Sequence, residues 1–160
     1  MRSERETAWS ASTRALRAIA WGGLICGTLD ISAAFVVYGY FGARPLPLLQ
    51  GIAAGLLGKA AFQGGIATAS LGLLLHFFIA ALATAVYYAV SRRAQFLVEH
   101  TLLSGPLYGV AVYFFMNRVV VPLSGARKYP FSLKMMIIGV MIHIVCVGTP
   151  IALVVRKFST

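Results

Sequence analysis

Acidic residues are scarce in this sequence. Only 4 of its 160 residues are Asp or Glu, and charged residues of both signs make up 11% of the chain. A soluble globular domain carries about 25% charged residues, so a soluble fold of this length could not cover its own surface. The scarcity argues against an ordinary soluble domain, and it leaves general acid–base chemistry with few carriers.

Catalytic and ligand-binding motifs are lacking too. The chain has no GxSxG, Walker A or HExxH sequence and no paired carboxylates. Its two cysteines, Cys26 and Cys146, stand inside apolar runs without CxxC or zinc spacing. They fit a soft metal-ligand or redox pair, or two small buried hydrophobic residues, and the second interpretation is favoured. We therefore expect no enzyme, and no cofactor is firmly implied.

Apolar sequence is what the chain has in abundance. Hydrophobic residues make up 59% of it, and a membrane-spanning helix needs about 20 consecutive apolar residues. Four runs meet that length, at about residues 18–41, 66–90, 101–121 and 135–155. With short loops they use nearly the whole chain, so we expect residues 1–160 to form a single integral membrane domain. The expected fold is all-α, a bundle of four transmembrane helices.

The segment at about residues 46–63 is apolar but differs from the four runs. Arg44, Pro45 and Pro47 end the first span before it begins. Its apolar residues recur at helical spacing, yet only about 14 uncharged residues separate Arg44 from Lys59, too few to cross a bilayer. We expect a short interfacial or re-entrant helix here, between spans one and two.

The basic residues explain a net charge of +10. They stand between the apolar runs, which is typical of topology signals and headgroup contacts, so we expect no nucleic-acid binding. The polar N-terminal arm lacks the pattern of a cleavable signal, and the charge bias favours cytoplasmic N- and C-termini. On the outer side, five residues are expected to contact lipid headgroups: Arg44, Lys59, Arg118, Arg127 and Lys128.

Three ionisable residues lie inside the expected spans, Asp30, His76 and His143. Counted from the outer ends of their spans, all three lie about 12 Å deep at the helical rise of about 1.5 Å per residue. Tyr113 falls near the same depth, and Asn117 lies about one turn nearer the outer face. Small residues surround the three, which indicates helix–helix contact rather than lipid. We expect one polar cluster facing the bundle interior.

Three roles for this cluster remain open. In a hydrogen-bonded clamp, Asp30 accepts a bond from His76 or His143 and holds the helices in register. In a proton or ion site, the carboxylate and the imidazoles pass protons or bind a cation. In a cofactor site, His76 and His143 ligate a metal or a haem.

From Leu71 onward the chain resembles the YagU-like group of small bacterial inner-membrane proteins. The resemblance rests on His76-Phe-Phe, Tyr87-Tyr88, Gly105 with Gly109, Pro122-Leu123 and His143. It covers mainly residues 71–157, and it implies a multi-pass helical topology in the bacterial inner membrane without a particular reaction. The chain departs from the YagU pattern in its apolar Pro45–Gly65 segment, which is longer and more polar in that group.

The leading function class is a non-enzymatic inner-membrane component or an accessory subunit. Its partners would be the lipid bilayer and a larger membrane complex or further copies of itself, although the GxxxG spacings favour packing within the chain. One alternative is a proton- or ion-handling transporter or channel-like unit that uses the Asp/His cluster. Another is a haem- or metal-binding redox membrane protein.

Overall fold

The computed structural model describes residues 2–128 and 130–159, with side chains from Ser12 onward. All regular structure in these residues is helical, and they contain no strand. The all-α class is therefore confirmed. The first four elements in chain order are α1 (Arg2–Tyr40), α2 (Pro45–Leu57), the 3-10 helix η1 (Gly58–Gln63) and α3 (Gly65–Ser91).

The second half of the chain contains two long helical runs. The first comprises α5 (Thr101–Phe115), the π-helical turn η2 (Met116–Val120) and α6 (Val121–Leu123), and it follows the short α4 (Phe96–Glu99). The second comprises α7 (Leu133–Ile142), the π-helical turn η3 (His143–Gly148) and α8 (Thr149–Ser159).

Each π turn directly precedes a proline-containing helix. Pro122 and Pro150 have no N–H to donate, and a proline ring clashes with the carbonyl of the preceding turn. Each π-helical turn instead has a hydrogen bond that spans five residues. In η2 the Val121 N–H donates to the Met116 carbonyl, and in η3 the Thr149 N–H donates to the Ile144 carbonyl. The prolines therefore shift the hydrogen bonds by one residue without breaking either helical run.

Five stretches are long and apolar enough to cross a membrane: Ser12–Tyr40, Pro45–Gln63, Gly65–Ser91, Thr101–Leu123 and Leu133–Ser159. Four of them correspond to the expected spans, and Pro45–Gln63 is the segment expected at the interface. That segment is not one straight helix, because α2 ends at Leu57 and the next residue, Gly58, has a φ of +57°. The 13 residues of α2 extend only about 20 Å at the helical rise, against a hydrocarbon core of about 30 Å.

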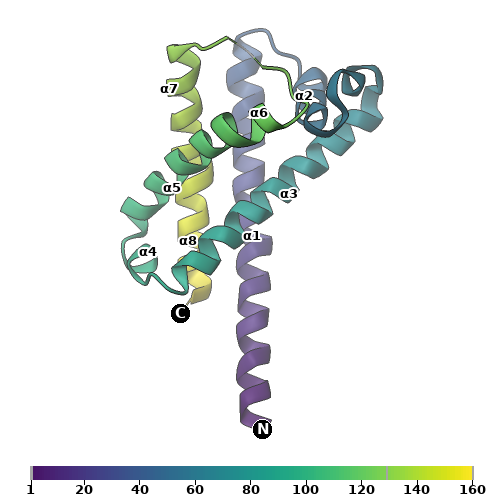
Figure 1. Ribbon diagram of the computed structural model, residues 1–160. Helices are drawn as coiled ribbons and strands as arrows, with labels where there is room; N and C mark the ends of the chain where they lie inside the picture. The colour runs from purple at the N-terminus through teal and green to yellow at the C-terminus, as the bar shows by residue number, and fades with distance from the viewer. Residues whose placement is uncertain (1, 129, 160) are drawn as a thin grey trace.

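α1 packs against α3 and the α7–α8 run (Figure 1). α1 contacts α3, η3 and α8, while α5 contacts η3 and α8, and α2 lies on α3. In Figure 1, α1 and the α7–α8 run are upright, and α3 and α5 cross them at a tilt. The tip of α1, all of α2 and η1, and the start of α3 lie at the upper end; the end of α3, α4 and the C-terminus lie at the lower end.

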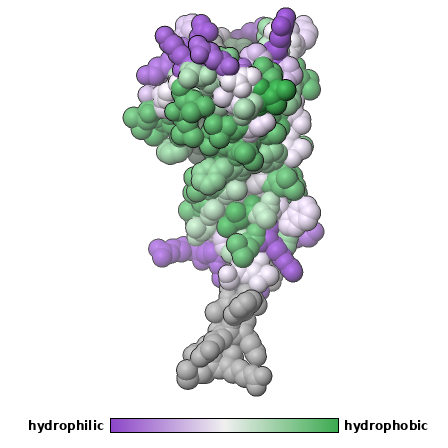
Figure 2. All heavy atoms as spheres, turned by 90° about the vertical axis from the view of Figure 1, so that its right-hand side faces the viewer, coloured by the Kyte–Doolittle hydropathy of each residue, from purple (hydrophilic) through white to green (hydrophobic). Residues whose placement is uncertain are grey.

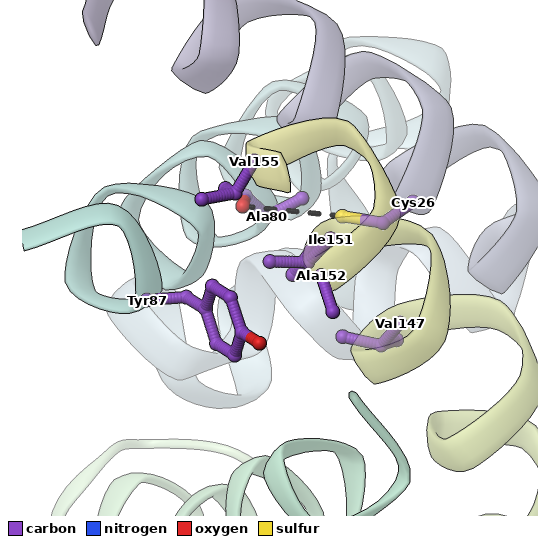
Figure 3. Packing of buried hydrophobic residues seen from close by; sticks show 7 residues of the cluster. All are labelled: Cys26, Ala80, Tyr87, Val147, Ile151, Ala152 and Val155. Atoms are coloured by element: carbon purple, nitrogen blue, oxygen red, sulfur yellow. Dashed lines mark hydrogen bonds between the residues drawn. The ribbon is translucent and has the colours of Figure 1, made fainter. Parts of the chain in front are cut away.

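The main core lies between α1, α3 and the C-terminal run, and Figure 3 shows it. Its buried members are Cys26, Ala80, Tyr87, Val147, Ile151, Ala152 and Val155. The helix backbones approach closely beside this core, as at Gly23, where an added Cβ would lie 2.7 Å from the Cα of Ala81. Such close approach is the packing mode of helices in lipid.

Most large apolar side chains point outward instead. Leu74, Phe78 and Leu107 expose 69%, 64% and 59% of their surface. Figure 2 shows the result as an apolar belt between two polar rims. The upper rim has the exposed basic residues Arg44, Lys59, Arg118, Arg127, Lys128 and Lys134, and the lower rim has Arg14, Arg17, Arg92, Arg93, Arg156 and Lys157. A belt of this size is unstable in water and matches the hydrocarbon layer of a bilayer.

Candidate functional site

Asp30 is the only acidic residue within the long helices from Ser12 onward. It lies on α1, one turn after Cys26, and is half-buried. Its carboxylate interacts electrostatically with Cys26, Tyr38 and Cys146. It makes no hydrogen bond or ion pair with any residue that the structure describes. A carboxylate in the apolar belt without such a partner is costly, and this is the usual mark of a functional position in a membrane protein.

His76 lies on α3 and faces α1. Its Nε2 atom donates a hydrogen bond to the backbone carbonyl of Gly27, across 2.8 Å. Gly27 has no side chain, and a Cβ there would lie 2.7 Å from the ring of Phe77, so α3 can approach the α1 backbone at this point. His76 thus joins α1 to α3. The acceptor is the Gly27 carbonyl rather than the carboxylate of Asp30, three residues later.

His143 is bonded within its own helical run. Its Nδ1 atom donates to the Gly139 carbonyl across 2.9 Å. The imidazole also packs edge-to-face on the ring of Tyr113, with 5.3 Å between the ring centroids. Gly139 makes this possible, since a Cβ at that position would lie 2.5 Å from the Tyr113 ring. The structure therefore brings Tyr113 and His143 together.

Tyr38 connects the two halves of the cluster. It interacts electrostatically with both Tyr113 and Asp30, so both groups lie within electrostatic range of its hydroxyl. The cluster expected from the sequence did not include Tyr38. A tyrosine near the end of a span is also typical of an interfacial residue, so no signal in the sequence singled it out.

Asn117 is not part of this cluster. Its Nδ2 atom donates to the Tyr113 carbonyl one turn earlier, across 2.9 Å, and the side chain is exposed. A bond of this kind satisfies the amide within its own helix. We call the four connected side chains, Asp30, Tyr38, Tyr113 and His143, the Asp30 cluster; His76 adjoins it through Gly27.

The two histidines have separate hydrogen-bond partners. His76 is bonded to α1 and His143 to its own helix, and no interaction joins the two rings. Among the residues from Ser12 onward that the structure describes, no group of three or more His, Cys, Asp or Glu side chains could hold a metal ion. The arrangement thus supplies no observation in favour of a shared haem or metal site.

A second polar network lies at the lower end, and sequence reasoning missed it. The Tyr87 hydroxyl lies 2.9 Å from the Leu97 carbonyl and 2.8 Å from the Ser104 hydroxyl, which itself donates to Leu97. Tyr108 on α5 donates to the Ala83 carbonyl on α3 across 2.7 Å. These bonds tie α3 to α5 and to the turn between them. A serine and two tyrosines in apolar runs are too common to have singled out this role.

A third set of bonds fixes α2 and η1 onto α3. Gln50 on α2 is only 3% exposed, and its amide donates to the Gly65 carbonyl and to the Thr68 hydroxyl, at 3.0 and 3.3 Å. Thr68 donates in turn to the Ala61 carbonyl across 2.6 Å. Gly72 lets the α2 backbone approach closely at Leu49. This α2–η1–α3 hairpin therefore satisfies its buried polar groups internally.

The exposed basic residues of the upper rim include all five that were expected to contact headgroups. One further cation, Lys134, lies over the ring of Phe41, with its ammonium nitrogen 4.7 Å from the ring centroid. This contact joins the end of α1 to the start of α7.

In comparisons with known proteins, no family model matches the chain, and no curated protein or solved structure matches it either.

Proposed function

We propose that the chain is a small, non-enzymatic component of the bacterial inner membrane. The observation that carries this proposal is the apolar belt held between two basic rims (Figure 2). The sequence offers only Glu4, Glu6, Asp30 and Glu99 as carboxylates, and the structure groups none of the described ones into a pair. An accessory subunit of a larger membrane complex, or of an oligomer of this chain, fits these properties best.

In the proposed topology four helical runs cross the membrane. These are α1, α3, the α5–α6 run and the α7–α8 run, while α2 and η1 stay at the upper side. The support is geometric, because the tip of α1 and the start of α3 lie at the same end of the bundle (Figure 1). Four crossings put both termini on one side. The YagU-like group, which the second half of the chain resembles, fits this multi-pass topology.

The proposed orientation has both termini in the cytoplasm. Basic residues at the lower end comprise Arg2, Arg5, Arg14, Arg17, Arg92, Arg93, Arg156 and Lys157. They outnumber those at the upper end, and cytoplasmic loops are the ones enriched in Lys and Arg.

Native electrophoresis tests the accessory role. The 17.2 kDa chain, expressed at its natural level and solubilised in a mild detergent, is expected to migrate in a larger assembly whose composition mass spectrometry then reads. A homo-oligomer and a hetero-complex are distinguished by that composition. Migration as a monomer after chemical cross-linking in intact membranes would contradict the proposal.

A second candidate function, proton or cation handling, is favoured by one specific observation. The Asp30 carboxylate stands in the apolar belt without a hydrogen bond from the described residues, and Cys26, Tyr38 and Cys146 are close enough to sense its charge. A carboxylate in such surroundings is able to take up and release a proton or a small cation.

Ion flux into liposomes tests this candidate. The purified chain is reconstituted, and the flux of protons and of Na⁺ is followed with fluorescent indicators. Asp30→Asn is expected to abolish the flux, because it removes the ionisable group but retains its size. Glu99→Gln makes the same chemical change on the exposed α4 and is the matched control. Equal flux in the wild type and Asp30→Asn would remove the transport role.

A further inference from the structure

The lower end of α3 borders a hollow that none of the preceding functions uses. Its volume is about 410 Å³, and it is lined by Ala89, Val90, Arg93 and Ala94. Three of these residues are apolar, two of them alanines whose short side chains leave the space open. The fourth, Arg93, follows the last residue of α3, Ser91, by two positions.

The hollow lies where the apolar belt meets the lower rim. Val90 is 50% exposed and belongs to the last turn of α3, whereas Arg93 is an exposed residue of the lower rim. The apolar wall of the hollow therefore faces the level of lipid acyl chains, and its basic residue lies at the level of the headgroups.

Arg93 is free to bind a ligand. Its side chain makes no hydrogen bond or ion pair with the residues that the structure describes. Arg156, another residue of the lower rim, instead donates to the Thr101 hydroxyl, at 3.5 Å. A free guanidinium presents its planar donors in a fork that matches a phosphate oxygen pair.

The charge around the hollow selects the sign of the ligand. Five further basic residues of the lower rim are exposed, and Glu99 is the one acidic residue at this end from Ser12 onward among those described. A ligand with an anionic head and an apolar tail complements both parts of the hollow. We propose that this hollow binds an anionic phospholipid, with its phosphate on Arg93 and an acyl chain along Ala89 and Val90.

Neighbouring arginines allow a matched test of the headgroup contact. Arg92 and Arg93 are both exposed, but only Arg93 lines the hollow. The purified chain is mixed with phosphatidylglycerol or with phosphatidylcholine, and native mass spectrometry measures the bound lipid. Arg93→Gln is expected to lower the retention of phosphatidylglycerol about five-fold, the change that one basic residue at a membrane surface supports. Arg92→Gln should retain it, and neither variant should alter phosphatidylcholine.

A second pair of variants tests the apolar wall with the charge unchanged. Ala89→Trp fills the hollow and is expected to displace phosphatidylglycerol. Leu82→Trp lies on the same helix two turns away, is lipid-exposed and does not line the hollow, so it should leave binding unchanged. Equal losses in Arg92→Gln and Arg93→Gln would overturn the proposal in favour of diffuse attraction to the rim. Unchanged binding in both Arg93→Gln and Ala89→Trp would overturn it as well.

Discussion

The imidazole of His76 on α3 hydrogen-bonds to the backbone carbonyl of Gly27 on α1, with 2.8 Å between Nε2 and the oxygen. Gly27 is buried, and His76 is half-buried at the same level of the belt. A helical carbonyl already accepts a bond from its own helix, and its second lone pair is available only where the partner helix comes close. The absence of a side chain at Gly27 provides that access.

Replacing His76 tests how much this bond stabilises the fold. His76→Leu keeps roughly the bulk of the side chain but removes the donor, so the free energy of unfolding should fall by about 1 kcal/mol, the usual worth of one interhelical bond in a membrane. His76→Gln retains a donor and should recover part of the loss. Unfolding in mixed micelles measures both, and a leucine variant as stable as the wild type would show that the bond contributes nothing.

The bond between His76 and Gly27 illustrates how much of the site could be predicted from the sequence. The polarity of Asp30, His76 and His143 in apolar runs was sufficient to expect them at the helix interfaces, because exposing an ionisable side chain to lipid is energetically costly. Their partners were not predictable. A side chain can bond to any backbone carbonyl within reach, and which one is nearest depends on the crossing of two helices rather than on residue type.

The glycines of α1 offer a sharper comparison, because two of them differ only in their surroundings. An added Cβ at Gly23 would lie 2.7 Å from the Ala81 Cα, whereas at Gly39 nothing lies within 4 Å. Gly23→Ala should therefore force α1 and α3 apart and lower the unfolding free energy by about 1–3 kcal/mol, the usual cost of overpacking. Thermal unfolding in detergent measures the change.

Gly39→Ala is the matched control, with the opposite expected sign. Alanine favours the helix over glycine by up to about 1 kcal/mol, and no neighbour opposes it at this position. The variant should unfold at the same temperature as the wild type or at a higher one. Equal destabilisation by both substitutions would mean that the close approach of α1 and α3 at Gly23 is not what limits stability.

The lower polar network predicts coupling between Tyr87 and Ser104. Their hydroxyl oxygens are 2.8 Å apart, and both side chains are almost fully buried. Tyr87→Phe and Ser104→Ala should each cost about 0.5–1.5 kcal/mol, the net worth of a typical hydrogen bond. The double variant should cost less than the sum, since each removes the same bond. Tyr40→Phe, at a side chain that is 86% exposed, should cost nothing, and strictly additive losses would exclude coupling.

This network also marks a limit of sequence reasoning. Tyr87 and Ser104 belong to different helices, and they meet because the turn containing α4 brings the end of α3 to the start of α5. Hydropathy finds each helix but contains no information on the rotation of one helix about its axis relative to another. The crossing of α2 over α3 was hidden for the same reason, because the sequence does not show that Gln50 is a buried donor to Gly65 and Thr68.

The number of membrane crossings, four or five, depends on the segment between α1 and α3. Pro45–Gln63 meets the length and hydropathy of a span, yet Gly58 divides it and α2 is too short to cross (about 20 Å at the helical rise). With four crossings, positions before and after this segment lie on the same side of the membrane. With five, they lie on opposite sides.

Single cysteines at exposed positions measure this directly. In a Cys26→Ala, Cys146→Ala background, Ala43→Cys and Gln63→Cys flank α2 and η1, while Ser12→Cys and Gln95→Cys lie at the lower end; all four positions are exposed. A membrane-impermeant maleimide added to intact spheroplasts should label the first two, because a charged reagent does not cross the apolar belt. The last two should react only after permeabilisation. Labelling of Ala43→Cys without Gln63→Cys would establish a fifth crossing, and the fully reversed pattern would place both termini outside.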